Sequence, residues 1–177
     1  MKVVTSYKKY KGLMTDFHHV VAQATRRGRV IGQRIFYGIF GFLGIASGCT
    51  LLFIATDRTE YSVAALGLIF GIYFAIRCLF YYQYLGFFTG RMMTKEIDEV
   101  IYTFDEEKVV IDNALEHCEH PYHVFFGVYE SKRIFVLMVT KRIGYIIAKA
   151  DFTQEELERF RALLCDYFEV PLKQFDF

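Results

Sequence analysis

One short stretch of the sequence gathers side chains that could bind a metal. Residues 117–123 read HCEHPYH and contain three histidines and one cysteine. Imidazole and thiolate groups are the usual ligands of zinc, so the candidate ligands are His117, Cys118, His120 and His123. Pro121 breaks any helix there, and no second ligand pair with zinc-finger spacing exists. We therefore expect a solvated loop with incidental histidines, and keep a metal site or a pH-responsive cluster as alternatives.

No catalytic signature accompanies this stretch. The chain contains no GxSxG, HExxH, P-loop or glycine-rich dinucleotide motif. The acidic run at residues 105–107 is better explained as a solvated turn than as paired catalytic acids. Cys118 has histidines beside it, but neighbours along a chain need not be oriented to activate a thiol. We predict that the protein is not an enzyme, with no catalytic residues and no cofactor.

Two long apolar segments set the architecture of the chain. Residues 35–56 contain 22 residues without a charge, and residues 61–82 form a second apolar run that only Arg77 interrupts. At about 1.5 Å per residue each run reaches roughly 33 Å, which is enough to cross a hydrocarbon core of about 30 Å. Only four residues, 57–60, connect them, so the helices must be antiparallel neighbours. We predict a transmembrane helical hairpin over residues 35–85.

Glycine spacing predicts how the two spans pack. Gly44 and Gly48 are four residues apart, and so are Gly67 and Gly71. This spacing makes a flat stripe on each helix and lets the backbones approach closely. We expect the stripes to pack against each other within the hairpin. The same stripes could instead join two copies of the chain into a homo-oligomer.

Charge predicts the orientation of the hairpin. Residues 1–34 carry eight lysines and arginines against one acid, and the loop between the spans has only Arg58. The positive-inside rule therefore places both termini in the cytoplasm. Arg77 lies near the end of its span, where a long side chain can snorkel to the headgroups. The residues expected at the membrane interface are Arg26, Arg27, Arg29, Arg34, Arg77, Tyr81 and Tyr82.

The two ends of the chain differ in charge and in periodicity. Residues 1–34 form an N-terminal cytoplasmic segment with a possible strand at 3–10, which could join the C-terminal domain. A basic amphipathic helix at 15–34 fits the anionic inner leaflet, or else packs on the cytoplasmic domain as an ordinary helix. Residues 96–177 hold nine basic and seventeen acidic residues. This balance predicts a water-facing domain and argues against nucleic acid as its partner.

Residues 96–177 alternate in hydropathy and then end in a helical pattern. Strands are expected at 100–104 and 108–112, followed by a loop or short strand at 113–121. Further strands at 124–129, 133–139 and 145–149 complete an antiparallel meander. Thr153 and Glu156 form a capping box for a helix that Pro171 ends. The expected fold class is membrane α+β, a two-helix transmembrane hairpin plus a small antiparallel β-sheet domain with a C-terminal helix.

Two stretches resemble the YcxB-like family of bacterial membrane proteins. They are IYTFDEEKVVI at residues 101–111 and the segment 124–164, in which IIAKADF at 146–152 before the capped helix is the most specific part. The resemblance implies two transmembrane helices and a cytoplasmic pleckstrin-homology-like domain in a bacterial cytoplasmic membrane. The family often has a tryptophan at the start of the central strand; this chain has none, and Tyr122 or His123 stands near that place.

The architecture favours two functions. The first is a membrane-anchored cytoplasmic interaction or regulatory module with an unknown protein partner. The second is a membrane immunity protein, in which the hairpin neutralises a pore-forming toxin or bacteriocin. Replacing the hairpin by an unrelated one should spare the first activity and abolish the second.

Overall fold

The chain folds into two units. The computed structural model describes residues 1–7, 9–10, 12–97 and 99–176, apart from the side chains of residues 92–96. One unit, here called the folded domain, consists of Met1–Thr25 and Leu85–Phe177; the other, the hairpin, is Arg26–Tyr84. The N-terminal residues therefore fold together with the C-terminal part of the chain, and the hairpin is inserted between them.

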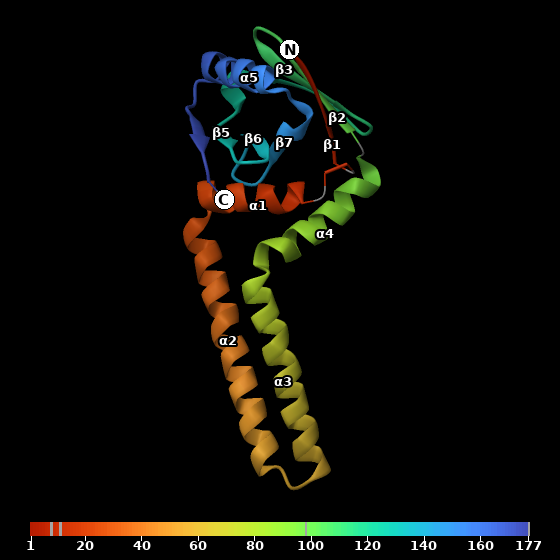
Figure 1. Cartoon of the computed structure of the whole chain (residues 1–177), viewed down its shortest axis with the longest axis vertical. Helices are drawn as coiled ribbons and strands as arrows, with labels where there is room; N and C mark the ends of the chain where they lie inside the picture. Colours follow the sequence, from red (N-terminus) through yellow and green to blue (C-terminus); the bar gives the residue numbers. More distant parts are fainter. Residues whose placement is uncertain (8, 11, 98, 177) are drawn as a thin grey trace. The chain divides into compact units, whose positions relative to one another are not determined.

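The hairpin consists of helix α2 (Arg27–Ile54) and helix α3 (Arg58–Leu79), which run antiparallel (Figure 1). Both helices are long and apolar enough to cross a membrane. Large apolar side chains such as Phe42, Phe53 and Leu79 are exposed along them. A soluble protein would bury such residues, so the surface of the hairpin suits a hydrocarbon environment.

Two helices differ from the sequence-based expectation. The helix expected at 15–34 is divided into α1 (Leu13–Thr25) and the first turns of α2, because Arg26 lies outside helical geometry with φ −139° and ψ 22°. The division falls where the chain leaves the folded domain. The expected second span, 61–82, ends at Leu79 and is followed by a further helix, α4 (Tyr81–Glu96).

The strands form two four-stranded sheets and not the single meander expected. The first has the order β1 (Lys2–Ser6), β2 (Glu99–Phe104), β3 (Lys108–Asn113), β4 (His117–Pro121), all antiparallel. The second has the order β7 (Gly144–Ala148), β6 (Ile134–Met138), β5 (Gly127–Glu130), β8 (Leu172–Gln174). The segment expected at 3–10 pairs with β2 as β1; its residue 8 lies outside the described residues.

Strand β8 is one of the elements that the sequence did not reveal. It follows Pro171 and pairs parallel with β5, so the second sheet is mixed. Two short 3₁₀ helices complete the domain, η1 (Tyr122–Val124) before β5 and η2 (Lys149–Asp151) after β7. The stretch 113–121, expected as a loop or short strand, contains β4.

One core joins both sheets to the C-terminal helix α5 (Gln154–Tyr167) (Figure 1). Phe160 of α5 is fully buried, and its ring lies 5.1 Å from Phe104 of the first sheet and 5.1 Å from Phe135 of the second. The predicted capping box is present: Glu156 accepts from the Thr153 N–H at 2.8 Å, and the Glu156 N–H donates back to Oγ1 of Thr153 at 3.3 Å. The antiparallel strands and the C-terminal helix of the expected α+β fold are thus confirmed.

Polar contacts also tie the sheets together inside the core. Tyr102 is fully buried, and its hydroxyl donates to the carbonyl of Ile146 in β7 at 2.9 Å. Burial raises the pKa of Tyr102 well above its usual value, since the phenolate would lose its hydration there. Thr5 in β1 accepts from the Ala148 N–H at 3.2 Å, which fixes the end of β1 against the end of β7.

Candidate functional site: a groove along the edge of β1

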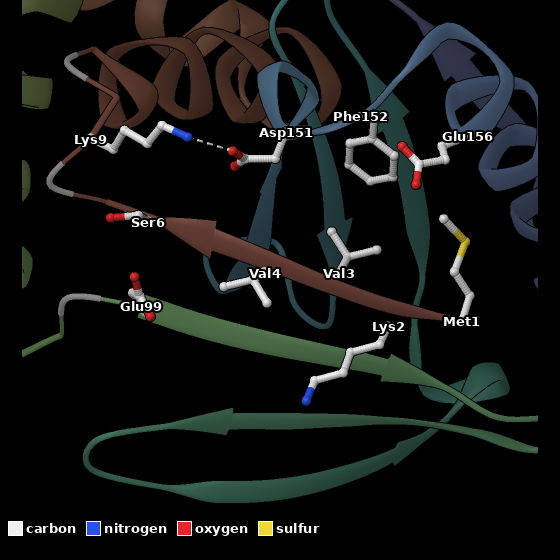
Figure 2. A pocket seen from close by; sticks show the side chains of 10 residues that line it. All are labelled: Met1, Lys2, Val3, Val4, Ser6, Lys9, Glu99, Asp151, Phe152 and Glu156. Atoms are coloured by element: carbon white, nitrogen blue, oxygen red, sulfur yellow. Dashed lines mark hydrogen bonds and ion pairs between the residues drawn. The ribbon is translucent and has the colours of Figure 1, made fainter.

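A groove of about 300 Å³ opens along the outer edge of β1. Figure 2 shows β1 on one side, with Val4 and Ser6, and the chain from Asp151 through Phe152 to Glu156 on the other. The groove forms because the elements beside β1 diverge. At Thr5 the edge of β1 is held to β7, but after β7 the chain turns through η2 into α5. The first residues of β1 therefore lie beside an open space.

The backbone of β1 has a defined orientation towards this groove. Met1 donates to the Phe104 carbonyl at 2.7 Å, and the Phe104 N–H donates back to the Met1 carbonyl at 2.7 Å. In an antiparallel pair such doubly bonded positions alternate with positions whose peptide groups point away from the partner. Val3 and Thr5 follow the pattern of Met1, so the peptide groups of Lys2 and Val4 point away from β2, towards the groove.

Side chains of both charges surround the groove. Lys9 Nζ donates to Asp151 at 3.0 Å, and the Tyr10 hydroxyl donates to the same carboxylate (Figure 2 draws the first of these bonds). Hydrogen bonds with Tyr10 and Asp151 raise the pKa of Lys9, which therefore stays charged. Lys2, Glu99 and Glu156 also line the groove. Hydrogen bonds from Thr153 lower the pKa of Glu156, so this side of the groove keeps a negative charge at neutral pH.

This arrangement is suited to binding an extended polypeptide. The described residues that line the groove include no histidine and no cysteine, so they offer no nucleophile paired with an imidazole base. They do offer the peptide groups of an edge strand, a partly exposed apolar side chain (Val4, 39% exposed) and charged rims. An extended polypeptide can use all three, because it pairs through its backbone and places alternate side chains on each face.

The histidines and cysteine of residues 117–123 are not gathered into one site. Strand alternation places His117 on the exposed face of β4, and Cys118 and His120 on the half-buried face. His120 Nε2 lies 2.9 Å from the Tyr145 hydroxyl, while His123 belongs to the following 3₁₀ helix. Within the described residues, no group of three His, Cys, Asp or Glu side chains could hold a metal ion.

Contacts on the exposed face of β4 are electrostatic. His117 Nδ1 is hydrogen-bonded to the Asp112 carboxylate across the strand pair, and this bond raises the pKa of His117. Lys108 donates to Glu119 at 2.6 Å on the same face, which lowers the pKa of Glu119. Burial raises the pKa of Cys118, so its thiol stays protonated and is a poor nucleophile.

The glycines of the two spans lie at the contact between α2 and α3. A Cβ atom added at Gly44 would come within 2.8 Å of the Gly71 Cα. A Cβ added at Gly48 would come within 2.8 Å of the Leu68 backbone nitrogen. Gly67 lies opposite, and a Cβ added there would be 3.4 Å from the Gly48 Cα. These stripes are therefore occupied by the hairpin itself. The backbones are too close to admit a side chain at Gly44, Gly48 and Gly71, whereas a Cβ added at Gly67 would make ordinary contact.

The residues expected at the membrane interface cluster where α2 begins and α3 ends. Arg77 donates to the Tyr73 hydroxyl at 2.9 Å, and its guanidinium lies 4.2 Å from the centre of the Tyr84 ring. Arg34 donates to the Cys78 carbonyl at 3.3 Å, and the Tyr81 hydroxyl donates to Gln33 at 2.6 Å. The remaining expected residues lie at the ends of helices: Arg26, Arg27 and Arg29 at the start of α2, and Tyr82 at the start of α4.

A buried charge cluster is centred on Glu130, a residue that lies just outside the strand expected at 124–129. Glu130 is only 3% exposed, and one carboxylate oxygen accepts from Lys149 at 2.5 Å and from Arg161 at 2.7 and 3.0 Å. Gln174 donates to the other oxygen at 3.1 Å. Burial tends to raise the pKa of Glu130, but hydrogen bonds from Arg161 and Lys149 outweigh it, and the pKa lies below its usual value.

The Glu130 cluster joins four elements that are far apart in the sequence. Glu130 ends β5, Lys149 starts η2, and the other two partners lie in α5 and β8. The signal that could have found it was Lys149, a charged residue that directly follows the apolar run at 145–148. The cluster holds α5 and β8 on the second sheet and does not line the groove.

Comparison with known proteins gives one result. The family model for YcxB-like proteins matches residues 104–164, which are 61 of the 177 residues. This match confirms the resemblance that the sequence stretches 101–111 and 124–164 indicated. It begins at the end of β2 and ends within α5. It therefore includes β3 to β7 in full but not β1 or β8. No curated protein and no solved structure matches the chain.

Proposed function

We propose that this protein is a membrane-anchored interaction module. In this proposal α2 and α3 cross the bacterial cytoplasmic membrane, both termini face the cytoplasm, and the folded domain binds an extended segment of a protein partner along β1. One observation carries the binding proposal: the peptide groups of Lys2 and Val4 point into a groove and away from β2.

Exposed apolar surface supports the anchoring part. Phe53 is 91% exposed and Phe42 is 73% exposed on helices that are long enough to span a bilayer. The basic residues of segment 1–34 favour a cytoplasmic N-terminus by the positive-inside rule. Because the hairpin has two spans, the C-terminal part of the folded domain then lies on the same side.

Architecture supports a pleckstrin-homology-like domain. Two sheets of four strands enclose one core, and α5 follows the last strand of the second antiparallel run and packs on both sheets through Phe160. The YcxB-like match over residues 104–164 is consistent with this layout. The fold likeness carries no ligand with it, and we rest the binding proposal on the groove alone.

The binding mode that fits the groove is addition of a strand. A partner strand paired with β1 would extend the first sheet and satisfy the outward peptide groups of Lys2 and Val4. Phe152 and Val4 offer apolar contact, and Lys2 and Glu99 offer opposite charges to alternate residues of the partner. Lysines on an exposed edge also discourage indiscriminate pairing, so such an edge favours a specific partner.

Site-specific crosslinking in cells tests this proposal. A photoreactive amino acid at Lys2 should give an adduct with one protein, whereas the same residue at Leu115, exposed on the β3–β4 turn, should not. Val4→Pro should abolish the adduct, because proline removes an N–H that points to the groove and leaves the pairing with β2 intact. Val4→Thr keeps that N–H and should preserve the adduct. Equal adducts for Val4→Pro and Val4→Thr would refute strand addition.

Exchange of the hairpin separates this function from membrane immunity. The glycine faces of α2 and α3 are already in contact with each other. An unrelated two-span hairpin should therefore preserve the Lys2 adduct and the activity of the partner. Loss of activity with an unchanged adduct would favour the alternative, in which the hairpin itself acts on a pore-forming toxin.

A further inference from the structure

The turn between β6 and β7, residues 140–143, exposes an apolar side chain next to two basic ones. Lys141 and Arg142 are exposed, and the side chain of Ile143 is 61% exposed. The turn is rigid: Oγ1 of Thr140 accepts from the N–H groups of Arg142 at 3.2 Å and Ile143 at 3.0 Å, and the Ile143 carbonyl accepts from Val139 at 3.1 Å. Ile143 is therefore held outward by its backbone and does not fold back onto the domain.

This turn is bonded to the residue at which the chain leaves the folded domain. The hydroxyl of Thr25, the last residue of α1, donates to the Lys141 carbonyl at 3.3 Å. Ile35, the first residue of the charge-free run, follows ten residues later, and α2 is helical from Arg27. The eight helical steps from Arg27 to Ile35 rise about 12 Å, and the two non-helical steps across Arg26 add at most about 7 Å, so Thr25 lies within roughly 19 Å of the start of that run.

That distance brings the turn within range of lipid headgroups. The headgroup layer adds about 5–7 Å on each side of the hydrocarbon core, and electrostatic attraction extends roughly a further 10 Å at 0.1 M salt. The segment between Thr25 and Ile35 itself carries Arg26, Arg27 and Arg29. The turn is thus bonded to the residue that directly precedes this basic segment, and an anionic bilayer surface is complementary to the charge of both.

A second turn of the same domain gives a contrast to residues 140–143. Leu115, in the β3–β4 turn, is 63% exposed, nearly the same as Ile143. Its neighbours are acidic, with Glu116 next to it and Asp112 at the end of the preceding strand. An anionic surface would repel that turn, so the two exposed apolar residues differ chiefly in the sign of the charge around them.

We propose that the β6–β7 turn is a lipid-binding contact of the folded domain. Lys141 and Arg142 pair with the phosphates of anionic lipids, and Ile143 enters the interfacial layer. The contact goes beyond anchoring by the hairpin, because it would hold the domain, and with it the β1 groove, in a fixed orientation on the membrane. It also explains how a domain with excess acid in residues 96–177 can rest against an anionic leaflet.

Environment-sensitive fluorescence of the full chain in lipid nanodiscs tests the contact. Cys49, Cys78, Cys118 and Cys165 are replaced by serine, and a polarity-sensitive dye is attached at Ile143→Cys or, as the matched control, at Leu115→Cys. The discs contain phosphatidylcholine alone or with phosphatidylglycerol at about a third of the lipid. We expect the dye at position 143 to shift to shorter wavelength in the anionic discs and to be quenched by lipids that carry a nitroxide; the dye at position 115 should do neither.

Charge reversal completes the test. Lys141→Glu with Arg142→Glu should remove the quenching at position 143, since loss of two cations alone lowers the ratio of docked to undocked turns by roughly thirtyfold. Arg159→Glu, an exposed change on α5, should leave the quenching intact. The proposal is overturned if positions 143 and 115 respond alike, if charge reversal has no effect, or if the shift at 143 occurs without quenching by nitroxide lipids, which would indicate contact with protein.

Discussion

Replacement of Glu130 by glutamine tests whether the buried charge cluster holds the folded domain together. The substitution removes the carboxylate that pairs with Lys149, whose side chain is 12% exposed and whose ammonium also lies 4.8 Å from the Phe135 ring centre. Breaking a buried ion pair costs about 3–5 kcal/mol, because the remaining charge is left uncompensated. Arg161 is 36% exposed and can turn to water. We therefore expect a loss of about 3 kcal/mol, at the lower end of that range.

Urea unfolding of the full chain in mild detergent measures this loss. The chain has 13 tyrosines and no tryptophan, and several tyrosines are buried in the domain, so near-UV circular dichroism reports its packing. With a slope of about 1.5 kcal/mol per M, the midpoint should fall by about 2 M urea. Glu158→Gln, an exposed substitution on α5, should change the free energy of unfolding by less than about 0.5 kcal/mol. Equal midpoints for the two variants would refute the reasoning.

The same cluster predicts a pH dependence. The pKa of Glu130 is lower in the folded state than in the unfolded chain, so its stabilising contribution is present above the unfolded pKa of about 4.3. That contribution is lost as the pH falls through the folded pKa. Unfolding free energies measured from neutral to acidic pH should therefore decline less steeply below about pH 4 in Glu130→Gln than in the original protein.

Three further predictions concern separate parts of the chain. Gly38→Cys should form a disulfide with Cys78 on oxidation in membranes, because its Cβ would lie 3.5 Å from that sulfur, and a cysteine one residue later should not. Thr153→Ala should lower the free energy of unfolding by about 1 kcal/mol in urea titration, because the capping box of α5 is lost. The His117 imidazole should titrate in NMR spectra above its usual pKa of about 6.5, and Asp112→Asn should move it back towards that value.

Local patterns in the sequence predicted the local elements. A run of 22 residues without a charge is sufficient to indicate a membrane-length helix, and α2 and α3 occupy the two expected runs. Alternation predicted the hairpin of β2 and β3 with its turn at 105–107, and the spacing of Thr153 and Glu156 predicted the start of α5. Each of these depends on residues within one element or between sequence neighbours.

Contacts between distant residues were not predictable in this way. The division of the helix at Arg26 depends on which unit each half packs into, and hydropathy does not report that. Strand β8 has three residues and exists because β5 offers an edge to it. The β1 groove is formed by residues near 1–9 and 151–156, and the Glu130 cluster joins β5 to partners up to 44 residues away. No spacing rule connects such positions.

The proposed function requires a hairpin that crosses the membrane with the folded domain on the cytoplasmic side. Labelling with a membrane-impermeant maleimide in intact cells measures this directly, with Arg58→Cys in the turn of the hairpin and the native Cys165, which is exposed on α5. The account predicts that the cysteine at position 58 is labelled in intact cells and that Cys165 is labelled only after the membrane is permeabilised. Labelling of Cys165 in intact cells at the rate seen after permeabilisation would contradict it.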